Sequence, residues 1–369
     1  MSYLRACIEI DLSALRANLQ VIRSQVMPAR VLAILKANAY GHGLVRIAKA
    51  LQEADGLGVA CVEEALQLRQ AGCLQKIVVL EGCLSAEECQ ISAQQQLDIV
   101  LHHHHQLQWL IQQPLARTIT VWLKVNTGMN RLGFPVSEVA QVWRMLHACP
   151  GVESIVLMSH LDSADLPELH PTRRQQDHFQ AAIQQLVGDS GGVTQCSLAN
   201  SAALLAWPET HYDWVRPGLA LYGVSPFAQT TAASYGLQPV MSLHSRLIAV
   251  RMLQAGETLG YHQTWRCREA IRMGVVAFGY GDGYPYHVVS GTPVLVNGQR
   301  ARLIGRVSMD MLTVDLNTHP DAKIGDPVVL WGKGLPIESV SQQAKRFAYE
   351  LLCGVQRDIK GRLQVQEVN

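Results

Sequence analysis

The chain has 369 residues, of which 48% are hydrophobic and 17% charged, and its 31 Lys and Arg nearly balance its 30 Asp and Glu. A net charge of +1 without any basic block gives no support for binding to nucleic acid or to an anionic membrane surface. No apolar run approaches the roughly 20 residues of a membrane span, and residues 1–11 lack the basic and apolar regions of a signal peptide.

The cysteines and histidines predict neither a disulfide framework nor a metal site. Nine cysteines without a Cys-x-x-Cys pair are typical of reduced thiols, so we expect a cytoplasmic enzyme. The four consecutive histidines at 102–105 point in different directions on a helix or strand end, whereas metal ligands must converge. We therefore interpret this run as a solvated surface feature.

Short apolar segments alternate with helical patterns from residue 31 to residue 216. Strands are predicted at 31–35, 58–61, 77–80, 98–101, 120–125, 155–159, 194–198 and 214–216. Helices are predicted at 12–25, 44–51, 62–70, 87–95, 136–147 and 175–186. This alternation favours an α/β fold, a (β/α)8 TIM barrel, with a doubly wound sheet as the structural alternative.

After residue 236 the pattern becomes mostly β. Strands are predicted at 242–253, 271–278, 311–315 and 328–331, and a helical segment near 337–352. Within 294–302, the pair Asn297-Gly298 predicts a hairpin with a type I′ turn. We therefore predict a barrel domain at 1–235 and a mostly β domain at 236–369, with residues 1–10 available to pair with the second domain.

Chemically useful side chains follow several of the predicted barrel strands. In a barrel the carboxyl ends of all strands face one mouth, so these side chains should converge. They are Lys36, Lys124, His160, Asn200, Ser201, Arg216 and Gly218. A lysine that ends a buried strand can have its pKa lowered by desolvation, and the neutral amine can then form a Schiff base with a carbonyl compound.

A set of motifs occurs in order along the chain. They are Lys36-Ala37-Asn38-Ala39-Tyr40, Lys124-Val125-Asn126-Thr127-Gly128-Met129-Asn130-Arg131, Ser159-His160, Asn200-Ser201, Arg216-Pro217-Gly218-Leu219, Leu259-Gly260-Tyr261, Gly279-Tyr280-Gly281-Asp282 and Gly305-Arg306-Val307-Ser308-Met309. In this order and at this spacing they resemble alanine racemases over nearly the full length of the chain.

The resemblance implies pyridoxal 5′-phosphate (PLP) as cofactor and the interconversion of L-alanine and D-alanine through a Schiff base of substrate and cofactor. Two bases would act on opposite faces, Lys36 and Tyr261 of the partner subunit, which implies a homodimer with shared active sites. Lys36 would also hold the cofactor. The remaining cofactor contacts would come from Tyr40, His160, Asn200, Ser201, Arg216, Gly218 and Leu219.

The resemblance also implies roles around the substrate. Arg131 and Met309 would lie at the substrate carboxylate, and the lysine at the position of Lys124 is carbamylated in many members of the family. Tyr280, Arg306 and Asp165 would line the entrance of the site. The product would supply D-alanine for peptidoglycan, or the reaction would run in D-alanine catabolism.

Two other functions share part of this pattern. A racemase or decarboxylase of a different amino acid could use the same fold, and a non-catalytic PLP-carrier protein would share the Lys36 motif but resemble the barrel alone.

One segment departs from the family. After Glu350-Leu351-Leu352-Cys353, residues 354–362 contain neither the Pro nor the Tyr that family members often carry there.

Overall fold

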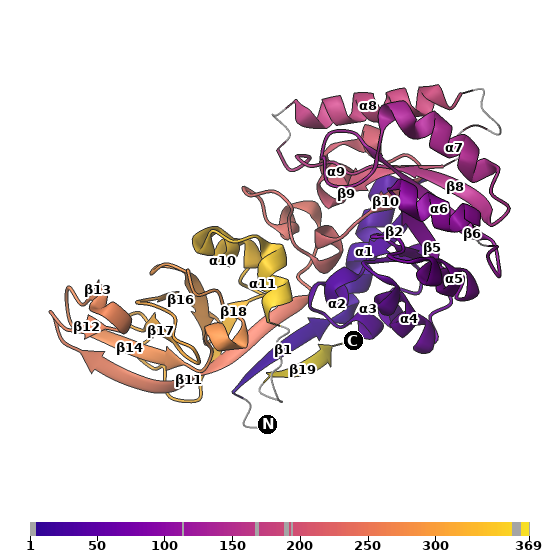
Figure 1. Cartoon of the computed structure of the whole chain (residues 1–369). Coiled ribbons are helices and arrows are strands. Elements are labelled where there is room, and N and C mark those ends of the chain that lie inside the picture. The colour runs from indigo at the N-terminus through magenta and orange to yellow at the C-terminus, as the bar shows by residue number, and fades with distance from the viewer. Residues whose placement is uncertain are drawn as a thin grey trace. The chain divides into compact units, whose positions relative to one another are not determined.

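Two units make up the chain in this computed structural model, which describes residues 5–112, 114–166, 170–187, 192, 195–355 and 363–368 (Figure 1). The barrel unit comprises Leu19–Ala39 and Gly43–Leu221. The β unit comprises the described residues up to Asn18, residues Tyr40–His42 and the described residues from Tyr222 onward. Each unit is described by itself.

Within the described residues, eight parallel strands form the ring of the barrel unit. They are β2 (Arg30–Ile34), β3 (Gly56–Val59), β4 (Ile77–Val79), β5 (Asp98–Leu101), β6 (Ile119–Asn126), β8 (Val152–Met158), β9 (Cys196–Asn200) and β10 (Trp214–Arg216). Their order is β5-β4-β3-β2-β10-β9-β8-β6, and the pairing of β5 with β6 closes the ring. The predicted TIM barrel is confirmed, and the doubly wound alternative is wrong because an open sheet has no such closing pair.

Apolar runs explain why these segments form the ring. All residues of β3, β4 and β5 are buried, as expected for parallel strands covered on both faces. Each predicted strand overlaps an observed one, and 98–101 and 214–216 coincide with β5 and β10. A short strand, β7 (Phe134–Pro135), pairs with β6 beyond the ring.

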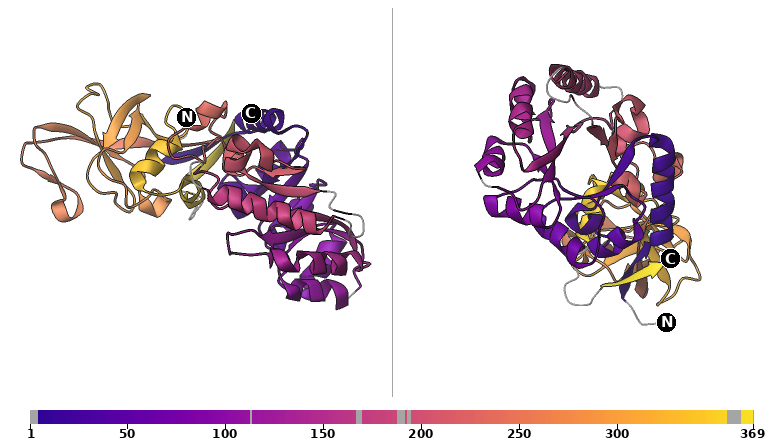
Figure 2. Two further views of the ribbon diagram at one scale, coloured as in Figure 1. Left: turned by 90° about the horizontal axis from the view of Figure 1, so that it is seen from above. Right: turned by 90° about the vertical axis from the view of Figure 1, so that its right-hand side faces the viewer.

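Helices lie outside the ring of strands, as the right-hand view of Figure 2 shows. They are α1 (Leu12–Val26), α3 (Leu44–Ala50), α4 (Val62–Gln70), α5 (Ala86–Gln94), α6 (His104–Gln112), α7 (Val139–His147), α8 (Pro171–Gln185) and α9 (Ser201–Ala206). The sequence did not predict α6 or α9. The histidine run obscures the start of α6, and α9 has only six residues, too few for a periodic pattern.

The histidine run lies where α6 begins. His103, His104 and His105 are exposed, and His104 Nε2 lies 2.7 Å from Glu138 Oε2. Among the residues that the structure describes, no three His, Cys, Asp or Glu side chains are grouped so that they could hold a metal ion. None of the described helices is both long and apolar enough to cross a membrane.

The β unit contains a largely antiparallel sheet. Its order is β14 (Ile271–Val276), β17 (Leu312–Asp315), β16 (Gln299–Leu303), β15 (Pro293–Val296), β18 (Pro327–Trp331), β11 (Met241–Leu253), β1 (Ala6–Asp11) and β19 (Leu363–Val368). The thirteen-residue strand β11 also pairs with β14, which closes the strands from β14 to β11 into a second, smaller barrel. The predicted mostly β C-terminal part is confirmed.

Turns and helices complete the β unit. Asn297 and Gly298 have φ of 51° and 77° and join β15 to β16, which confirms the predicted hairpin. The predicted helical segment consists of α10 (Ile337–Ala344) and α11 (Ala348–Gly354). A small hairpin, β12 (Thr258–Leu259) and β13 (Trp265–Arg266), was not predicted, and it carries the helical turn η5 (Tyr261–Gln263) at its tip.

Candidate active site

Lys36 opens a left-handed turn, α2 (Lys36–Tyr40), just after strand β2. Ala37, Asn38, Ala39 and Tyr40 have φ of 55°, 52°, 55° and 49°. Each left-handed residue of this kind costs roughly 1–2 kcal/mol, so such a run persists only where its surroundings hold it. A strained segment that follows directly after a candidate catalytic lysine is typical of a functional site.

Hydrogen bonds to Asn38 and its neighbours hold this turn. The Asn38 backbone carbonyl accepts from the N–H of Gly43 at 3.0 Å, and its side-chain Oδ1 accepts from the N–H of Leu44 at 2.7 Å. The Asn38 N–H donates to Glu64 Oε1 at 3.2 Å on the neighbouring helix α4. The turn is therefore tied to both α3 and α4, which fixes where Lys36 leaves the strand.

Arg216, the last residue of β10, is buried and surrounded by acceptors. Its Nη1 donates to Ser197 Oγ at 2.6 Å, and its Nη2 donates to the carbonyls of Ser159 at 2.5 Å and Leu198 at 3.1 Å. Burial lowers the pKa of Arg216 to about 10, so the guanidinium keeps its charge at neutral pH. The side chain is a fixed cation on the inside of the barrel.

His160 follows β8 and lies beside this cation. Burial and the nearby charges of Arg216 and Lys124 hold the pKa of His160 well below its usual range, so the ring is neutral at neutral pH. Its Nδ1 lies 3.3 Å from Arg216 Nη2, and because a guanidinium can only donate, Nδ1 is the acceptor. The proton of the neutral ring is therefore on Nε2.

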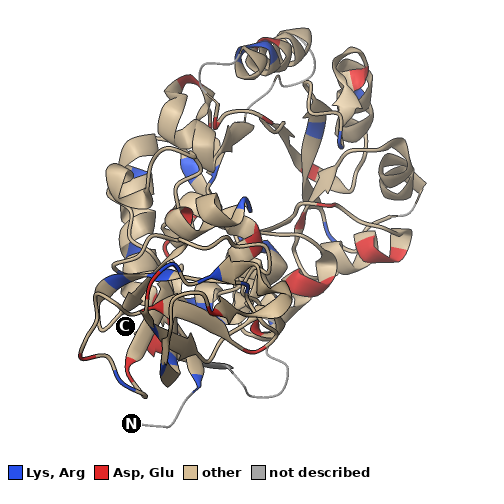
Figure 3. Cartoon of the chain, turned by 90° about the vertical axis from the view of Figure 1, so that its left-hand side faces the viewer, with Lys and Arg blue, Asp and Glu red and all other residues tan. Residues whose placement is uncertain are grey.

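Lys124 and Arg131 complete a group of basic side chains in the barrel. Lys124 is buried in β6, and burial followed by the charges of Arg216, Arg131 and Lys36 lowers its pKa to about 8. Lys124 and these three cations all lower the pKa of His160. We call Lys36, Lys124, Arg131 and Arg216 the cationic cluster. Figure 3, which views the barrel end-on, shows several Lys and Arg segments in blue around the ring of strands.

Ser201 and Asn200 organise the turn between β9 and α9. Ser201 Oγ accepts hydrogen bonds from the N–H groups of Gly218 at 2.8 Å and Ala220 at 3.3 Å, so a hydroxyl and two amides meet at one point. Asn200 Oδ1 accepts from the N–H of Ala202 at 3.1 Å, and its Nδ2 donates to the carbonyl of Leu161 at 3.1 Å. These bonds give Asn200 a structural role at the turn, beside any contact with a cofactor. Leu219 is buried next to Gly218.

Tyr40 ends the left-handed turn and packs within the β unit. Its ring centroid lies 4.9 Å from that of Tyr222 and 5.5 Å from that of Tyr349. Burial, with a smaller contribution from Tyr349, raises the pKa of Tyr40 above its ordinary value. The hydroxyl therefore stays protonated at neutral pH and is able to donate a hydrogen bond.

Lys36 is exposed, so the desolvation expected of a lysine at the end of a buried strand is not observed, and Arg131 is exposed as well. Several other predicted site residues are also accessible. In the β unit, Tyr261 is 67% exposed on η5, Met309 is 57% exposed, and Arg306 is also exposed. Tyr280 lies on the turn η6 (Tyr280–Asp282). Asp165 is half-buried in the barrel unit after β8. Residues 354–362 form the segment that differs from the family pattern, and residues 356–362 of it lie outside the described part of the chain.

Ser159 and Ser197 are not among the residues predicted for the site. Both are buried and both bind Arg216, and Ser159 Oγ also lies 2.8 Å from Thr127 Oγ1. Ser197 lies inside a strand rather than at its end, so the strand-end criterion missed it. A polar residue within an otherwise apolar buried strand is the signal that could have found it.

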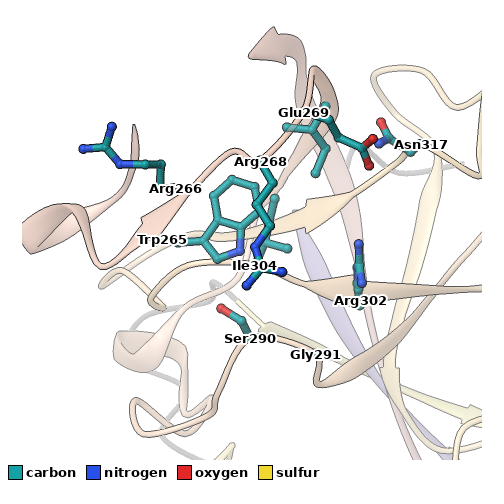
Figure 4. Close-up of a pocket in the computed structure, with 10 residues that line it drawn as sticks. Trp265, Arg266, Arg268, Glu269, Ser290, Gly291, Arg302, Ile304 and Asn317 are labelled. Carbon is teal, nitrogen blue, oxygen red and sulfur yellow. The ribbon is translucent and has the colours of Figure 1, made fainter. Parts of the chain in front are cut away.

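A separate cavity of about 320 Å³ lies in the β unit, and Figure 4 shows its lining. Arg302 there is bound to Asp315, with Nη2 2.7 Å from Oδ2, and Arg266 donates to the Gly256 carbonyl at 3.1 Å. Trp265 and Ile304, also in the lining, pack in a small hydrophobic cluster. The lining includes none of the residues predicted for the site.

Comparisons with known proteins match nearly the whole length of the chain. A family model described as alanine racemase, N-terminal domain, matches residues 10–226, and one described as alanine racemase, C-terminal domain, matches residues 240–363. An alanine racemase of Nitrosococcus oceani is 50% identical over 347 residues, which cover 94% of this chain and 96% of the relative. One of Shewanella amazonensis is 46% identical over 351 residues, with coverage of 93% and 95%.

Solved structures agree with the sequence comparisons. The biosynthetic alanine racemase from Pseudomonas aeruginosa superposes with a TM-score of 0.93 at 40% identity, covering 99% of this chain and 100% of that one. The alanine racemase from Acinetobacter baumannii gives a TM-score of 0.91 at 35% identity, with the same coverage. The chain therefore belongs to the alanine racemase family.

Proposed function

We propose that this protein is an alanine racemase that interconverts L-alanine and D-alanine with PLP as cofactor. The structural observation that carries the proposal is the cationic cluster, in which Lys124 and Arg216 are buried and Lys36 and Arg131 are exposed. It brings Lys36, a candidate amine for the cofactor, together with Lys124, Arg131 and Arg216 around a neutral His160. Membership of the family over the whole chain favours this activity over a decarboxylase or a carrier protein.

The residues of the site fit an anionic cofactor. A phosphorylated aldehyde brings negative charge to a place where four cations repel one another, which relieves that repulsion. The Ser201 hydroxyl, whose oxygen accepts from the Gly218 N–H, would donate to the phosphate beside Gly218 and Leu219, with the protonated hydroxyl of Tyr40 as a further donor. When bound, PLP forms a covalent link to an amine and withdraws electrons from the carbon that loses its proton.

Arg216 would face the ring nitrogen of the cofactor. Its bonds to Ser197, Ser159 and Leu198 hold the guanidinium in place, and its charge is kept at neutral pH. A guanidinium donates a hydrogen bond but does not give up its proton, so it leaves the ring nitrogen unprotonated. This limits electron withdrawal, which favours return of the proton to the same carbon over competing reactions.

Two bases are required to exchange one enantiomer for the other. Lys36 Nζ would take or return the proton on one face of the substrate, and Tyr261 of the partner subunit would do so on the other. Arg131 and Met309 would hold the substrate carboxylate, with Tyr280, Arg306 and Asp165 at the entrance. With its pKa lowered to about 8, Lys124 is neutral in a larger fraction of molecules near physiological pH than an ordinary lysine, and the neutral amine is the form that reacts with CO₂ to give a carbamate.

Exposed aromatic and apolar residues in the β unit support a homodimer with shared sites. Tyr261, Tyr280, Tyr286, Met309 and Met311 are all large side chains that are at least 39% exposed. The rings of Tyr280 and Tyr286 lie 5.4 Å apart, and the turn of Tyr280 is hydrogen-bonded to the turn of Met309. Exposed apolar side chains that adjoin one another in this way are typical of a protein-binding surface. Two of the residues proposed to act on substrate, Tyr261 and Met309, belong to this set.

The cysteines support a cytoplasmic location. Each of the nine, all of which lie in the described part of the chain, is a free thiol, and most are buried. Thiols persist in a reducing compartment, whereas secreted proteins tend to pair them. The proposed location is therefore the cytoplasm.

A pair of arginine variants tests the function. Arg216→Lys removes the planar guanidinium that would donate to the cofactor. It should lower kcat/KM for L-alanine by about 100-fold, as loss of a positioned charge-assisted donor does. Arg69→Lys is the matched control, because Arg69 also donates to several barrel carbonyls, among them Cys73 at 2.7 Å and Gln95 at 2.9 Å, but lines no part of the proposed site. We expect Arg69→Lys to lose stability and to keep its racemisation rate.

Borohydride reduction followed by peptide mapping locates the cofactor. The label should fall on Lys36, and a label on Lys124 would contradict the assignment. A wild-type protein that released CO₂ from an amino acid, or bound PLP without racemising L-alanine, would favour one of the two alternatives instead.

A further inference from the structure

Arg5 joins the N-terminal end of the chain to two turns of the β unit. Its Nη1 and Nη2 donate to Asp282 Oδ1 at 2.9 Å and Oδ2 at 3.0 Å, a bidentate pair, and Nη2 also donates to the backbone carbonyl of Asp310. The Asp282 side chain is 4% exposed and that of Arg5 is 30% exposed. We call Arg5, Asp282 and Asp310 the Arg5 clamp.

The clamp holds two turns, η6 (Tyr280–Asp282) and the turn at residues 308–310, whose backbones are hydrogen-bonded to each other. Tyr280 N–H donates to the Ser308 carbonyl at 3.1 Å, and Gly281 N–H donates to the Met309 carbonyl at 2.8 Å. A Cβ on Gly279 would lie 2.3 Å from the Ser308 carbonyl oxygen, so only glycine permits this approach. The first turn carries Tyr280 and the second carries Met309.

Both ends of the clamp are themselves anchored. The Arg5 carbonyl accepts from Ser245 Oγ at 3.1 Å, and the next residue, Ala6, pairs with Ser245 where β1 joins β11. On the other side, Asp282 Oδ2 accepts from the N–H of Gly279 at 3.0 Å, which closes the turn that carries Tyr280. The Arg5 side chain therefore links both turns to the segment that pairs with the long strand β11, in addition to the backbone bond from Ala277 to Arg246 of β11.

We propose that Arg5 is a positioning residue that sets the substrate-facing side chains Tyr280 and Met309. Met309 is 57% and Tyr280 39% exposed, so their backbone, more than packing around the side chains, decides where they point. Loss of the clamp removes the contact between Arg5 and both turns, so the turns can shift from their present positions. The inference rests on the proposed function, in which Met309 lies at the substrate carboxylate and Tyr280 at the entrance.

The geometry requires an arginine at this position. A planar guanidinium makes two parallel bonds to one carboxylate and still reaches a backbone carbonyl, whereas a lysine ammonium offers a single point of charge. Asp282 is buried, so a lysine at position 5 also leaves part of its carboxylate without a partner. Arg5→Lys therefore loosens the turns while it keeps the charge.

The test compares Arg5→Lys with Arg302→Lys in the full-length, PLP-loaded enzyme. Arg302, which Figure 4 labels, is the matched control, because its Nε and Nη2 lie 2.9 and 2.7 Å from Asp315 Oδ2 in the same unit and this ion pair involves neither turn. Arg5→Lys should raise KM for L-alanine by about tenfold, with kcat changed by less than about twofold, because a small displacement of binding groups weakens substrate positioning. Cofactor absorbance should stay unchanged. Arg302→Lys should lower the melting temperature alone.

Each outcome bears on the proposal. An unchanged KM in Arg5→Lys, or an equal rise in KM in Arg302→Lys, would overturn it. If Arg5→Lys does not fold, Asp282→Asn takes its place with the same criterion, and failure of both to fold beside a folded Arg302→Lys would leave Arg5 a purely structural role. A wild-type enzyme that does not racemise alanine refutes the proposed function, whereas an active wild type with an unchanged KM in the variant refutes only this inference.

Discussion

Lys124 carries its charge in a place that disfavours charge. It is buried in β6, and the next contributions to its pKa, after burial, come from the cations Arg216, Arg131 and Lys36. Its pKa falls from 10.5 to about 8. Since folding places an ammonium in this environment at neutral pH, the folded state bears a cost that the unfolded chain does not.

We expect Lys124→Met to stabilise the cofactor-free protein near pH 7 and to lose this advantage toward pH 10.5. Below a pH of about 8 the lysine is protonated in both states, so the full cost of up to about 3 kcal/mol opposes folding. Between about 8 and 10.5 the unfolded chain binds one more proton than the folded protein, so the stability of the wild type rises with pH. Urea unfolding in CO₂-free buffer at several pH values measures the difference.

Lys49→Met is the control for this prediction, because Lys49 is exposed on α3 and should show little effect at any pH. Addition of bicarbonate extends the test. A carbamate on Lys124 replaces the buried ammonium with an anion among cations, so bicarbonate should stabilise the wild type and leave Lys124→Met unchanged. A stability difference that does not vary with pH would contradict the argument.

At the scale of single elements, the left-handed turn α2 is the most unusual feature. Its residues adopt a conformation that is unfavourable for L-amino acids. Asn38 holds the turn by accepting a hydrogen bond from Leu44 of α3 and donating one to Glu64 of α4. The turn lets the chain leave β2 and enter α3 within a few residues while it presents Lys36 at the end of the strand. Local strain is thus maintained by packing of the neighbouring helices.

Glycine should therefore have opposite effects at two alanines. Ala37 is exposed with φ of 55°, so Ala37→Gly relieves strain and should raise the free energy of unfolding by about 0.5–1 kcal/mol. Ala17 lies in the middle of the right-handed helix α1, where Ala17→Gly should lower it by about 0.5–1 kcal/mol. Urea unfolding curves of the two variants provide the comparison, and effects of the same sign would show that α2 is not strained.

At the scale of the whole molecule, the residues of the proposed site are divided between the two units. Lys36, His160, Ser201 and Arg216 belong to the barrel unit, whereas Tyr261 and Met309 belong to the β unit. The units divide after Leu221, close to the end of the first family model at residue 226, and the second family model begins at residue 240. It allows one subunit to supply the cofactor residues of a site and another subunit to supply the second base.

Mixing two inactive variants tests whether sites are shared. A heterodimer of Lys36→Ala and Tyr261→Ala contains one site with both substitutions and one with neither, so activity should return in proportion to the heterodimer formed. Lys36→Ala mixed with Arg216→Ala is the matched control, because both residues lie in the barrel unit and every site would keep one defect. If verified subunit exchange restores no activity in the first mixture, both bases act within one chain.

Local sequence determined much of the secondary structure. Buried strands such as 98–101 and 214–216, the helix at 62–70 and the type I′ turn at Asn297-Gly298 were all predicted, because apolar periodicity and turn preferences act over a few residues. The motifs of the site were also visible in the sequence, since each is a short string of residues at a strand end.

Only the tertiary structure decided what these elements bring together. The pairing of β5 with β6 and of β11 with β14 closes each barrel, and neither pairing has a local signal. Ser197 contacts Arg216 because β9 lies beside β10, and Arg5 meets Asp282 although 277 residues separate them. Such contacts depend on how distant segments pack, which the local preferences of neither segment contain. The sequence by itself therefore determined the elements and the chemical groups, and the fold decided which groups act together.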